Sequence, residues 1–395
     1  MRLKSFALNI LLLFGSVSFA LVVLELLLRA MPGLMPEEAQ LRIHWRQMAN
    51  ADTAKTRPDP YLGFLYPPNA RGDLDQTNVR FEFRMDSHGF RNLGTWPDQA
   101  DVVAVGDSWV FSYGVNDEEA WPRLVERSVP GTRVINLGLS GFAPEQYTRS
   151  YERFGAPLHP KVLLYGIFPG NDLVDTRDFE RWLAAGSPGN YNTWRTAARM
   201  RQLNIPIVAK SYVALLVKES WRNREARFTS RTVTWGDGSK LRLAGDLYRK
   251  DAGHAHSGDP QFEGALAALE RARTLAAGQG TKVVVLLFPT KEEVYLPLLN
   301  KPVPRPLAPF AQELARRGIT YIDFRGPFTT QAKAGRSVYL EVDPHPNQAG
   351  YALIASTVSE YLERHATALG LKLPRPSRSG PAGPADRLAA DRLRR

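Results

Sequence analysis

The sequence predicts an α/β fold in which buried strands alternate with helices. Short apolar runs rich in valine and leucine, such as Val102–Gly106 and Lys282–Phe288, are typical of strands that are buried on both faces. Segments with apolar residues at helical spacing lie between several of these runs. A polar or glycine-rich turn follows several of the runs directly. This alternation predicts βαβ units and a parallel sheet.

The expected elements follow each other in a regular order. The predicted strands are 102–106, 133–138, 161–167, 282–288 and 319–323. The predicted helices are 117–128, 261–278, 309–317 and a last helix that Asn347 caps and that continues to about His365. The region 176–250 interrupts this order.

Composition and charge exclude several classes of function. The 395 residues include no cysteine, which excludes disulfides and thiolate metal sites. The net charge of +11 is concentrated in two regions, because residues 176–250 carry 15 Lys/Arg against 6 Asp/Glu and residues 371–395 carry 7 against 2. The remainder of the chain is slightly acidic and contains no nucleic-acid-binding motif. We therefore expect no nucleic-acid partner.

The N-terminal residues 1–30 predict a transmembrane anchor. The run from Phe6 to Leu24 has no charged residue and is long enough to span a bilayer as a helix. The alternative is a cleavable signal peptide ending near Ala20, but the apolar run continues through that position. Arg2 and Lys4 predict an N-terminus on the cytoplasmic side. The expected location is a single-pass protein of the inner membrane with its catalytic domain in the periplasm.

Residues 31–100 predict a stalk with short strands, because several prolines interrupt helices there. The segment Val79–Met85 alternates apolar and charged residues as a half-buried strand does. Arg84, His88 and Arg91 are candidate active-site residues, but a solvated turn is the favoured interpretation of them.

The rest of the chain is expected to form one catalytic domain, 101–365, and a disordered basic tail, 366–395. The basic insert 176–250 within the domain contains a largely apolar stretch, Ile205–Val217. Packing in the core is the default interpretation of this stretch. Contact with an anionic membrane surface is the alternative.

Four short motifs indicate where the chemistry takes place. Three of the motifs each follow a predicted strand: Gly106-Asp107-Ser108, the turn ending at Gly141, and Gly170-Asn171-Asp172. The fourth, Asp343-Pro344-His345, precedes the last helix. Ligands of open α/β sheets bind at the carboxyl ends of the strands. We therefore expect these four motifs to lie together.

The Asp-Pro-His-Pro sequence suggests a catalytic pair. Pro344 and Pro346 disfavour helical geometry at the residues before them, so Asp343 and His345 are expected to be extended. Residues two apart in an extended segment point to the same side, which brings the carboxylate to the imidazole. Asp343 would then orient His345 as the acid of a Ser-His-Asp triad does. Asp107 is an alternative acid, although its place beside Ser108 suits a brace of the turn.

These motifs resemble those of the SGNH hydrolase family, also called GDSL-like lipases and esterases. The resemblance extends over roughly 102–361, with 176–250 as an atypical insertion. It implies a parallel five-stranded sheet with helices on both faces. It also implies that Ser108 is the nucleophile, that His345 is the base oriented by Asp343, and that an oxyanion hole is formed by the N–H groups of Ser108 and Gly141 with the Asn171 amide.

Two departures from the family pattern bear on the function. The spacing Asp343-x-His345 is shorter than the commoner spacing and resembles the branch that acetylates or deacetylates cell-surface polysaccharides. Pro169 stands in the turn before Asn171 and is expected to affect how the amide is aimed. Lys291 lies in a stretch that also resembles this branch, where it either meets an anionic substrate or is a solvated surface lysine.

The leading hypothesis is a membrane-anchored esterase that cleaves an acyl or acetyl ester, with a polysaccharide as a possible substrate. An O-acyltransferase is the alternative within ester chemistry, since the same triad serves both reactions. A non-catalytic glycan-binding scaffold is the alternative outside it. No cofactor and no metal are expected, because ester cleavage by a triad needs neither.

Overall fold

The computed structural model describes residues 2–35, 55–76, 79–201, 211–217, 220, 230–244, 256–301, 303, 305 and 307–373. Within this part of the chain, five parallel strands form one sheet in the order β11-β10-β7-β5-β6. The strands are β5 (Val102–Val105), β6 (Val134–Asn136), β7 (Val162–Ile167), β10 (Lys282–Leu287) and β11 (Tyr321–Asp323). This sheet confirms the expected α/β class and all five predicted strands.

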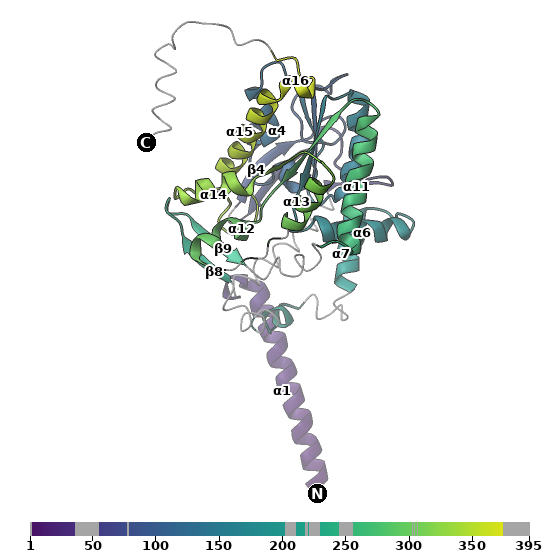
Figure 1. Cartoon of the computed structure of the whole chain (residues 1–395). Helices are drawn as coiled ribbons and strands as arrows, with labels where there is room; N and C mark the ends of the chain where they lie inside the picture. The colour runs from purple at the N-terminus through teal and green to yellow at the C-terminus, as the bar shows by residue number, and fades with distance from the viewer. Residues whose placement is uncertain are drawn as a thin grey trace.

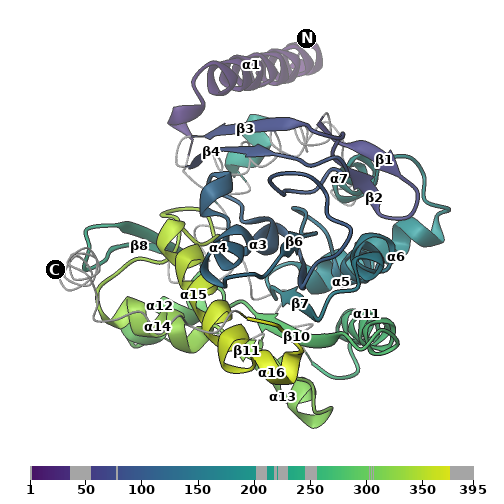
Figure 2. The same ribbon diagram turned by 90° about the horizontal axis from the view of Figure 1, so that it is seen from above.

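Helices cover both faces of the sheet (Figure 2). Successive residues of β5 point to opposite faces, so Val103 and Val105 belong to one core and Val102 and Ala104 to the other. The first core is covered by α5 (Pro144–Ser150), α6 (Asp172–Ala184), α11 (Pro260–Ala277) and α13 (Leu307–Arg316). The second core is covered by α4 (Trp121–Ser128), α12 (Lys291–Tyr295), α14 (Arg325–Lys333) and α15 (Gln348–Arg364).

The predicted helices occur close to their expected bounds. The Asn347 side chain accepts a hydrogen bond from the Gly350 N–H at 2.9 Å and caps α15 as expected. The helix expected from Asp117 differs: residues 117–119 form a 3₁₀ turn, and α4 begins at Trp121. Pro122 lies in the first turn of α4, where its missing N–H costs no helical hydrogen bond.

The segment before the sheet is not a stalk. Residues 55–100 contain two antiparallel pairs, β1 (Arg57–Asp59) with β2 (Gly63–Leu65) and β3 (Arg71–Gln76) with β4 (Val79–Arg84). Their apolar side chains, including Phe64, Phe81 and Phe83, share one core with Val103 and Val105. The prolines do not make the segment independent of the domain, because its aromatic residues are buried against the sheet. Residues 36–54 lie outside the described part.

The insert packs on the domain, and the C-terminal region differs from expectation. In the insert, α7 (Tyr191–Arg201) and the hairpin of β8 (Ser230–Thr234) and β9 (Lys240–Ala244) pack on the domain through buried residues such as Tyr191 and Leu241. After α15, the short helix α16 (Ala366–Leu369) buries Leu369 in the second core. Residues 366–371 therefore belong to the domain and not to the expected tail, and residues 374–395 lie outside the described part.

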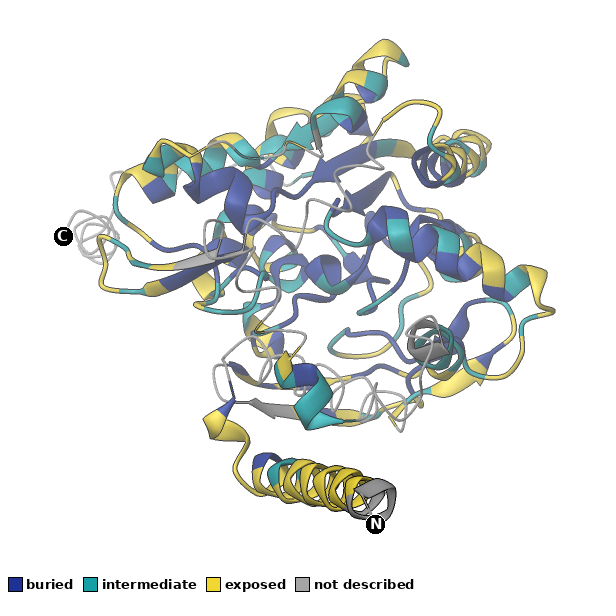
Figure 3. Ribbon diagram, turned by 90° about the horizontal axis from the view of Figure 1, so that it is seen from below, coloured by how far each residue is buried: buried dark blue, intermediate teal, exposed yellow. Residues whose placement is uncertain are grey.

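The helix α1 (Arg2–Ala30) projects from the domain (Figure 1). Its stretch Asn9–Ala30 is 22 residues long with a mean hydropathy of 2.5, which fits a membrane span or a signal sequence. The exposed side chains of α1 contrast with the buried inner faces of the helices around the sheet (Figure 3). Large apolar side chains of α1 are exposed, such as Leu11 and Phe19, which are both 72% exposed.

Candidate active site

The turn after β5 holds Ser108 at the start of a short helix. Asp107 caps α3 (Ser108–Phe111), and its carboxylate accepts a hydrogen bond from the Trp109 N–H at 2.9 Å. A Cβ at Gly106 would lie 2.3 Å from a methyl group of Val110, so only glycine permits this close approach of turn and helix. The Ser108 N–H lies in the first turn of α3, where N–H groups have no acceptor within the helix.

A chain of hydrogen bonds connects Ser108, His345 and Asp343. The Ser108 Oγ lies 2.6 Å from His345 Nε2, and His345 Nδ1 lies 2.5 Å from Asp343 Oδ1. The same carboxylate oxygen accepts the His345 backbone N–H at 2.9 Å, which holds the two residues together locally. With Nδ1–H directed to the carboxylate, Nε2 is free to accept the Ser108 proton. The site therefore has the geometry of a nucleophile, a base and an orienting acid.

The charges around the Ser108–His345–Asp343 hydrogen bonds favour an ionised Asp343. Burial would raise the pKa of Asp343, but the charge and hydrogen bonds of His345 and the charge of Lys291 hold this pKa below its ordinary value. An ionised Asp343 stabilises the imidazolium that forms when His345 takes a proton.

Asp107, the alternative acid, plays a different role. Its carboxylate lies 3.3 Å from the Ser108 Oγ, which is farther than His345 Nε2 at 2.6 Å. Burial raises the pKa of Asp107 to about 6. Its carboxylate accepts the Trp109 N–H and so stabilises the turn, which is the second role that the sequence suggested for Asp107.

The two other motifs follow β6 and β7, the strands on either side of β5. Gly141 has a φ of +80°, a left-handed conformation that favours glycine. Asn171 precedes α6, and its side-chain amide donates to the Asp175 carboxylate at 2.9 Å. An amide group carries two N–H bonds, so one N–H of Asn171 remains for another acceptor.

Arg195 connects these two motifs, which the sequence did not indicate. Its guanidinium Nη1 donates to the Gly141 carbonyl at 2.9 Å and lies 3.4 Å from the same Asp175 oxygen that holds Asn171. Arg195 comes from α7 in the insert, 54 residues after Gly141. No local sequence signal relates residues so far apart, because only tertiary packing brings them together.

The sequence indicated Asp172 only as part of the motif Gly170-Asn171-Asp172 and did not predict a role for it. It is fully buried, and its carboxylate accepts from the Tyr147 hydroxyl at 2.6 Å and the Phe168 N–H at 2.8 Å. Burial raises the pKa of Asp172 well above its usual value. The two bonds tie the turn that holds Asn171 to α5. The sequence feature that could have indicated this role is the pair of acidic residues Asp172 and Asp175 in the first turn of a helix.

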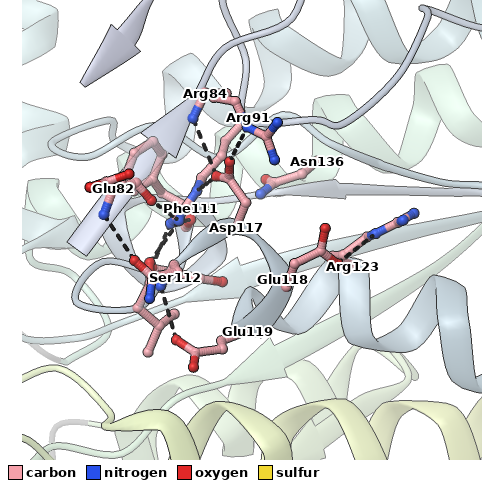
Figure 4. A network of polar contacts seen from close by, with 12 residues as sticks. Glu82, Arg84, Arg91, Phe111, Ser112, Asp117, Glu118, Glu119, Arg123 and Asn136 are labelled. Atoms are coloured by element: carbon pink, nitrogen blue, oxygen red, sulfur yellow. Dashed lines mark hydrogen bonds and ion pairs between the residues drawn. The ribbon is translucent and has the colours of Figure 1, made fainter. Parts of the chain in front are cut away.

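Arg91 proves to be a buried structural residue (Figure 4). Its guanidinium donates to the carbonyls of Phe111 at 3.1 Å, Ser112 at 2.8 Å and Val115 at 2.6 Å, and pairs with Asp117 at 3.0 Å. The interpretation as a solvated turn is therefore wrong for Arg91. It fixes the segment that follows the Ser108 helix.

Lys291 is buried, which corrects the interpretation of a solvated surface lysine. Its ammonium donates to the carbonyls of Leu340 at 2.6 Å and Glu341 at 3.1 Å, in the segment leading to Asp343. Burial lowers the pKa of Lys291 to about 8. Both bonds restrain the backbone that presents the orienting acid.

Replacement of Lys291 by methionine is expected to lower the free energy of unfolding by ~1–3 kcal/mol, because the partly buried Leu340 carbonyl loses its ammonium donor, whereas the Glu341 carbonyl keeps the Arg242 N–H. Unfolding in urea measures this loss. The matched variant Lys301→Met, at an exposed position, should leave the unfolding midpoint unchanged. Equal midpoints for the two variants would contradict a restraining role for Lys291.

In the described part of the chain, no group of three His, Asp or Glu side chains is placed to hold a metal ion.

Comparison with known proteins identifies the class. Residues 244–385 match the family model described as an SGNH hydrolase-like domain, acetyltransferase AlgX. This match confirms the resemblance to SGNH proteins, and it includes Asp343 and His345 but not the other three motifs. The class of protein is thus an enzyme of ester chemistry, either an ester hydrolase or an O-acetyltransferase.

The solved structures to which the chain is similar share little sequence identity with it. A lipolytic protein of the G-D-S-L family from Veillonella parvula shares 16% identity, covers 67% of this chain and 98% of its own, and has a TM-score of 0.37. TesA has 15% identity, coverages of 67% and 98%, and a TM-score of 0.36. A variant of the acetyl-xylooligosaccharide esterase Axe2 from Geobacillus shares 13% identity, covers 70% of this chain and 96% of its own, and has a TM-score of 0.37. No curated protein matches the chain.

Proposed function

We propose that this protein is a membrane-anchored, extracytoplasmic enzyme that transfers an acyl group from an ester through an acyl-enzyme at Ser108. The observation that carries the proposal is the hydrogen-bonded chain from Ser108 Oγ through His345 to Asp343. Triad chemistry requires this order of nucleophile, base and orienting acid.

The first half of the reaction follows from this geometry. His345 Nε2 takes the hydroxyl proton of Ser108 while Oγ bonds to the acyl carbon of the ester. The carbonyl oxygen becomes an oxyanion, which the N–H groups of Ser108 and Gly141 and the Asn171 amide stabilise. The bond to the leaving alcohol then breaks, and the alcohol takes the proton from His345. An acyl-enzyme remains.

The second half decides between two activities. Attack by water gives hydrolysis, and attack by a sugar hydroxyl gives O-acylation of a polysaccharide. In both cases His345 removes the proton from the attacking oxygen and returns it to the Ser108 Oγ when the acyl-enzyme bond breaks. The hydrolase needs no further group. The O-acetyltransferase is favoured by the match of residues 244–385 to an acetyltransferase domain.

An assay with a soluble acetyl ester donor, with and without oligosaccharide acceptors, tests this proposal. Release of acetate without an acceptor supports the esterase. Acetylated oligosaccharide at the expense of acetate supports the transferase. No turnover and no reaction of Ser108 with a fluorophosphonate probe would overturn both and favour the glycan-binding scaffold.

Arg195 is proposed to position the oxyanion hole. Substitution Arg195→Ala should lower kcat roughly 10- to 100-fold with little change in KM, because loss of one guanidinium releases both the Gly141 turn and Asp175. Arg195→Lys should recover part of the activity, since an ammonium keeps the charge but not the fork of donors. Steady-state kinetics with a soluble ester measure both constants.

The control is Arg181→Ala, at an exposed position of α6, which should keep wild-type kinetics. A KM increase at unchanged kcat for Arg195→Ala would instead make Arg195 a substrate-binding residue.

The anchor is proposed to place the catalytic domain outside the cytoplasm. A reporter that is active only in the periplasm should work when fused after residue 60, because Asn9–Ala30 is long and apolar enough to span the bilayer and Arg2 and Lys4 favour a cytoplasmic N-terminus. A cytoplasm-only reporter at the same position should be silent. Its activity would reverse the topology.

A further inference from the structure

Glu25 is a charged residue in the apolar part of α1, and the structure shows its partners. Its carboxylate accepts hydrogen bonds from the Ser211 hydroxyl at 2.8 Å, the Tyr212 N–H at 3.0 Å and the Val213 N–H at 2.9 Å. Residues 212–217 are helical, so Glu25 satisfies N–H groups that lack partners at the start of this helix. The cap comes from a residue 187 positions earlier in the chain.

Apolar packing extends the same contact. Leu28 in the last turn of α1, Met35 in the segment after α1 and Leu215 in the insert are each 3% exposed and form one cluster. Arg29 pairs with Glu25 at 2.7 Å and lies over the Tyr212 ring at 4.9 Å. The helix 212–217 therefore lies against the last turns of α1 through hydrogen bonds to Glu25, a cation–π contact of Arg29 and buried apolar surface.

The outer surface of this contact is apolar and continues along α1. Val217 is 62% exposed, and on α1 Leu26 and Leu27 are 62% and 45% exposed. The sequence on either side of the helix carries Lys210 and Lys218, within an insert of strong positive charge. An apolar surface with flanking basic residues matches the interface of a bilayer that contains anionic lipids.

We propose that segment 211–217 docks on the last turns of α1 through Glu25 and lies at the surface of an anionic lipid bilayer. This inference rests on the membrane anchoring proposed above. The docked segment makes α1 a fixed support of the domain in place of a flexible tether. The orientation of the domain relative to the bilayer is then set by this contact.

The absence of cysteine from the sequence allows the test to use single introduced cysteines. The full-length variants Val217→Cys and Ser356→Cys carry an environment-sensitive fluorophore in vesicles of phosphatidylethanolamine and phosphatidylglycerol. Ser356 is exposed on α15, away from α1 (Figure 1). The Val217 probe should be quenched by lipids with shallow spin labels and shielded from aqueous iodide. The Ser356 probe should show the opposite behaviour.

Glu25→Ala in the Val217→Cys background tests the docking residue. The Val217 probe should then become accessible to iodide, because the helix 212–217 loses its cap. Ser16→Ala is the matched control, since the Ser16 hydroxyl bonds to Leu13 within α1. Removal of the Glu25 charge makes α1 more apolar, so membrane retention should persist.

Extraction with alkaline carbonate separates the two proposals. Release of the wild-type chain from the vesicles would overturn the anchoring itself. Retention together with equal iodide quenching at Val217 and Ser356 would overturn this inference and leave the anchoring intact. An unchanged Val217 signal in the Glu25→Ala variant would also overturn it, because docking would not depend on Glu25.

Discussion

Replacement of Ser108 or His345 by alanine is expected to lower kcat by ~10⁵–10⁶, with the double variant scarcely worse than either single variant. The physical reason is that the two side chains act as one unit, since the 2.6 Å contact between Oγ and Nε2 is the path of the proton. Without the base the hydroxyl stays a poor nucleophile, and without the nucleophile the base has no proton to take.

Asp343→Asn should retain more activity than either alanine variant, because it disturbs the tautomer of His345 and leaves the nucleophile in place. Steady-state hydrolysis of a soluble acetyl ester measures all four variants. A fluorophosphonate probe should label the wild type and, more slowly, Asp343→Asn, but neither alanine variant, because labelling needs both the Ser108 hydroxyl and its base. His365→Ala, at an exposed position, is the control and should behave as wild type. Additive losses in the double variant would mean that Ser108 and His345 do not act together.

The second large effect concerns Asn171. Asn171→Ala is expected to lower kcat by ~10²–10³, or ~2.7–4 kcal/mol of transition-state stabilisation. One N–H of the amide is held by Asp175 at 2.9 Å, which orients the group and leaves the other N–H for the oxyanion. The unfolding midpoint should change little, because the side chain is partly exposed and does not cap α6.

Asn171→Asp is the matched variant of similar shape. It should lose at least as much activity as Asn171→Ala, because a carboxylate in place of the amide repels both Asp175 and the oxyanion. Steady-state kinetics with the same soluble ester measure both variants. An unchanged kcat in Asn171→Ala would mean that the amide is aimed away from the reacting carbonyl, as expected if Pro169 shifts the turn.

Local patterns in the sequence predicted the sheet and the positions of the motifs well. Strands buried on both faces have continuous apolar sequences, and β5, β7 and β10 are of this kind. Parallel strands place their carboxyl ends at one edge, so residues such as Ser108 and Asn171 were expected near each other from their positions after β5 and β7. The two prolines around His345 act on neighbouring residues and therefore also leave a signal in the sequence.

Contacts between distant segments were not predictable in the same way. The aromatic residues of β2 and β4 pack into the main core, although the prolines nearby suggested a separate stalk. Lys291 was expected to be solvated like most lysines, and its burial depends on two carbonyls 49 and 50 residues later.

The sequence by itself determined the α/β class, the five strands, the apolar N-terminal helix and the candidate residues Ser108, Asp343, His345, Gly141 and Asn171. Each of these depends on hydrophobic periodicity or on the conformational preferences of adjacent residues, and such information is contained within a few positions of the chain. The tertiary structure alone decided that Arg195 connects Gly141 with Asp175 and that Glu25 caps the helix 212–217. These bonds join groups 20 to 187 positions apart, and only the packing of the whole chain brings their atoms within hydrogen-bonding distance.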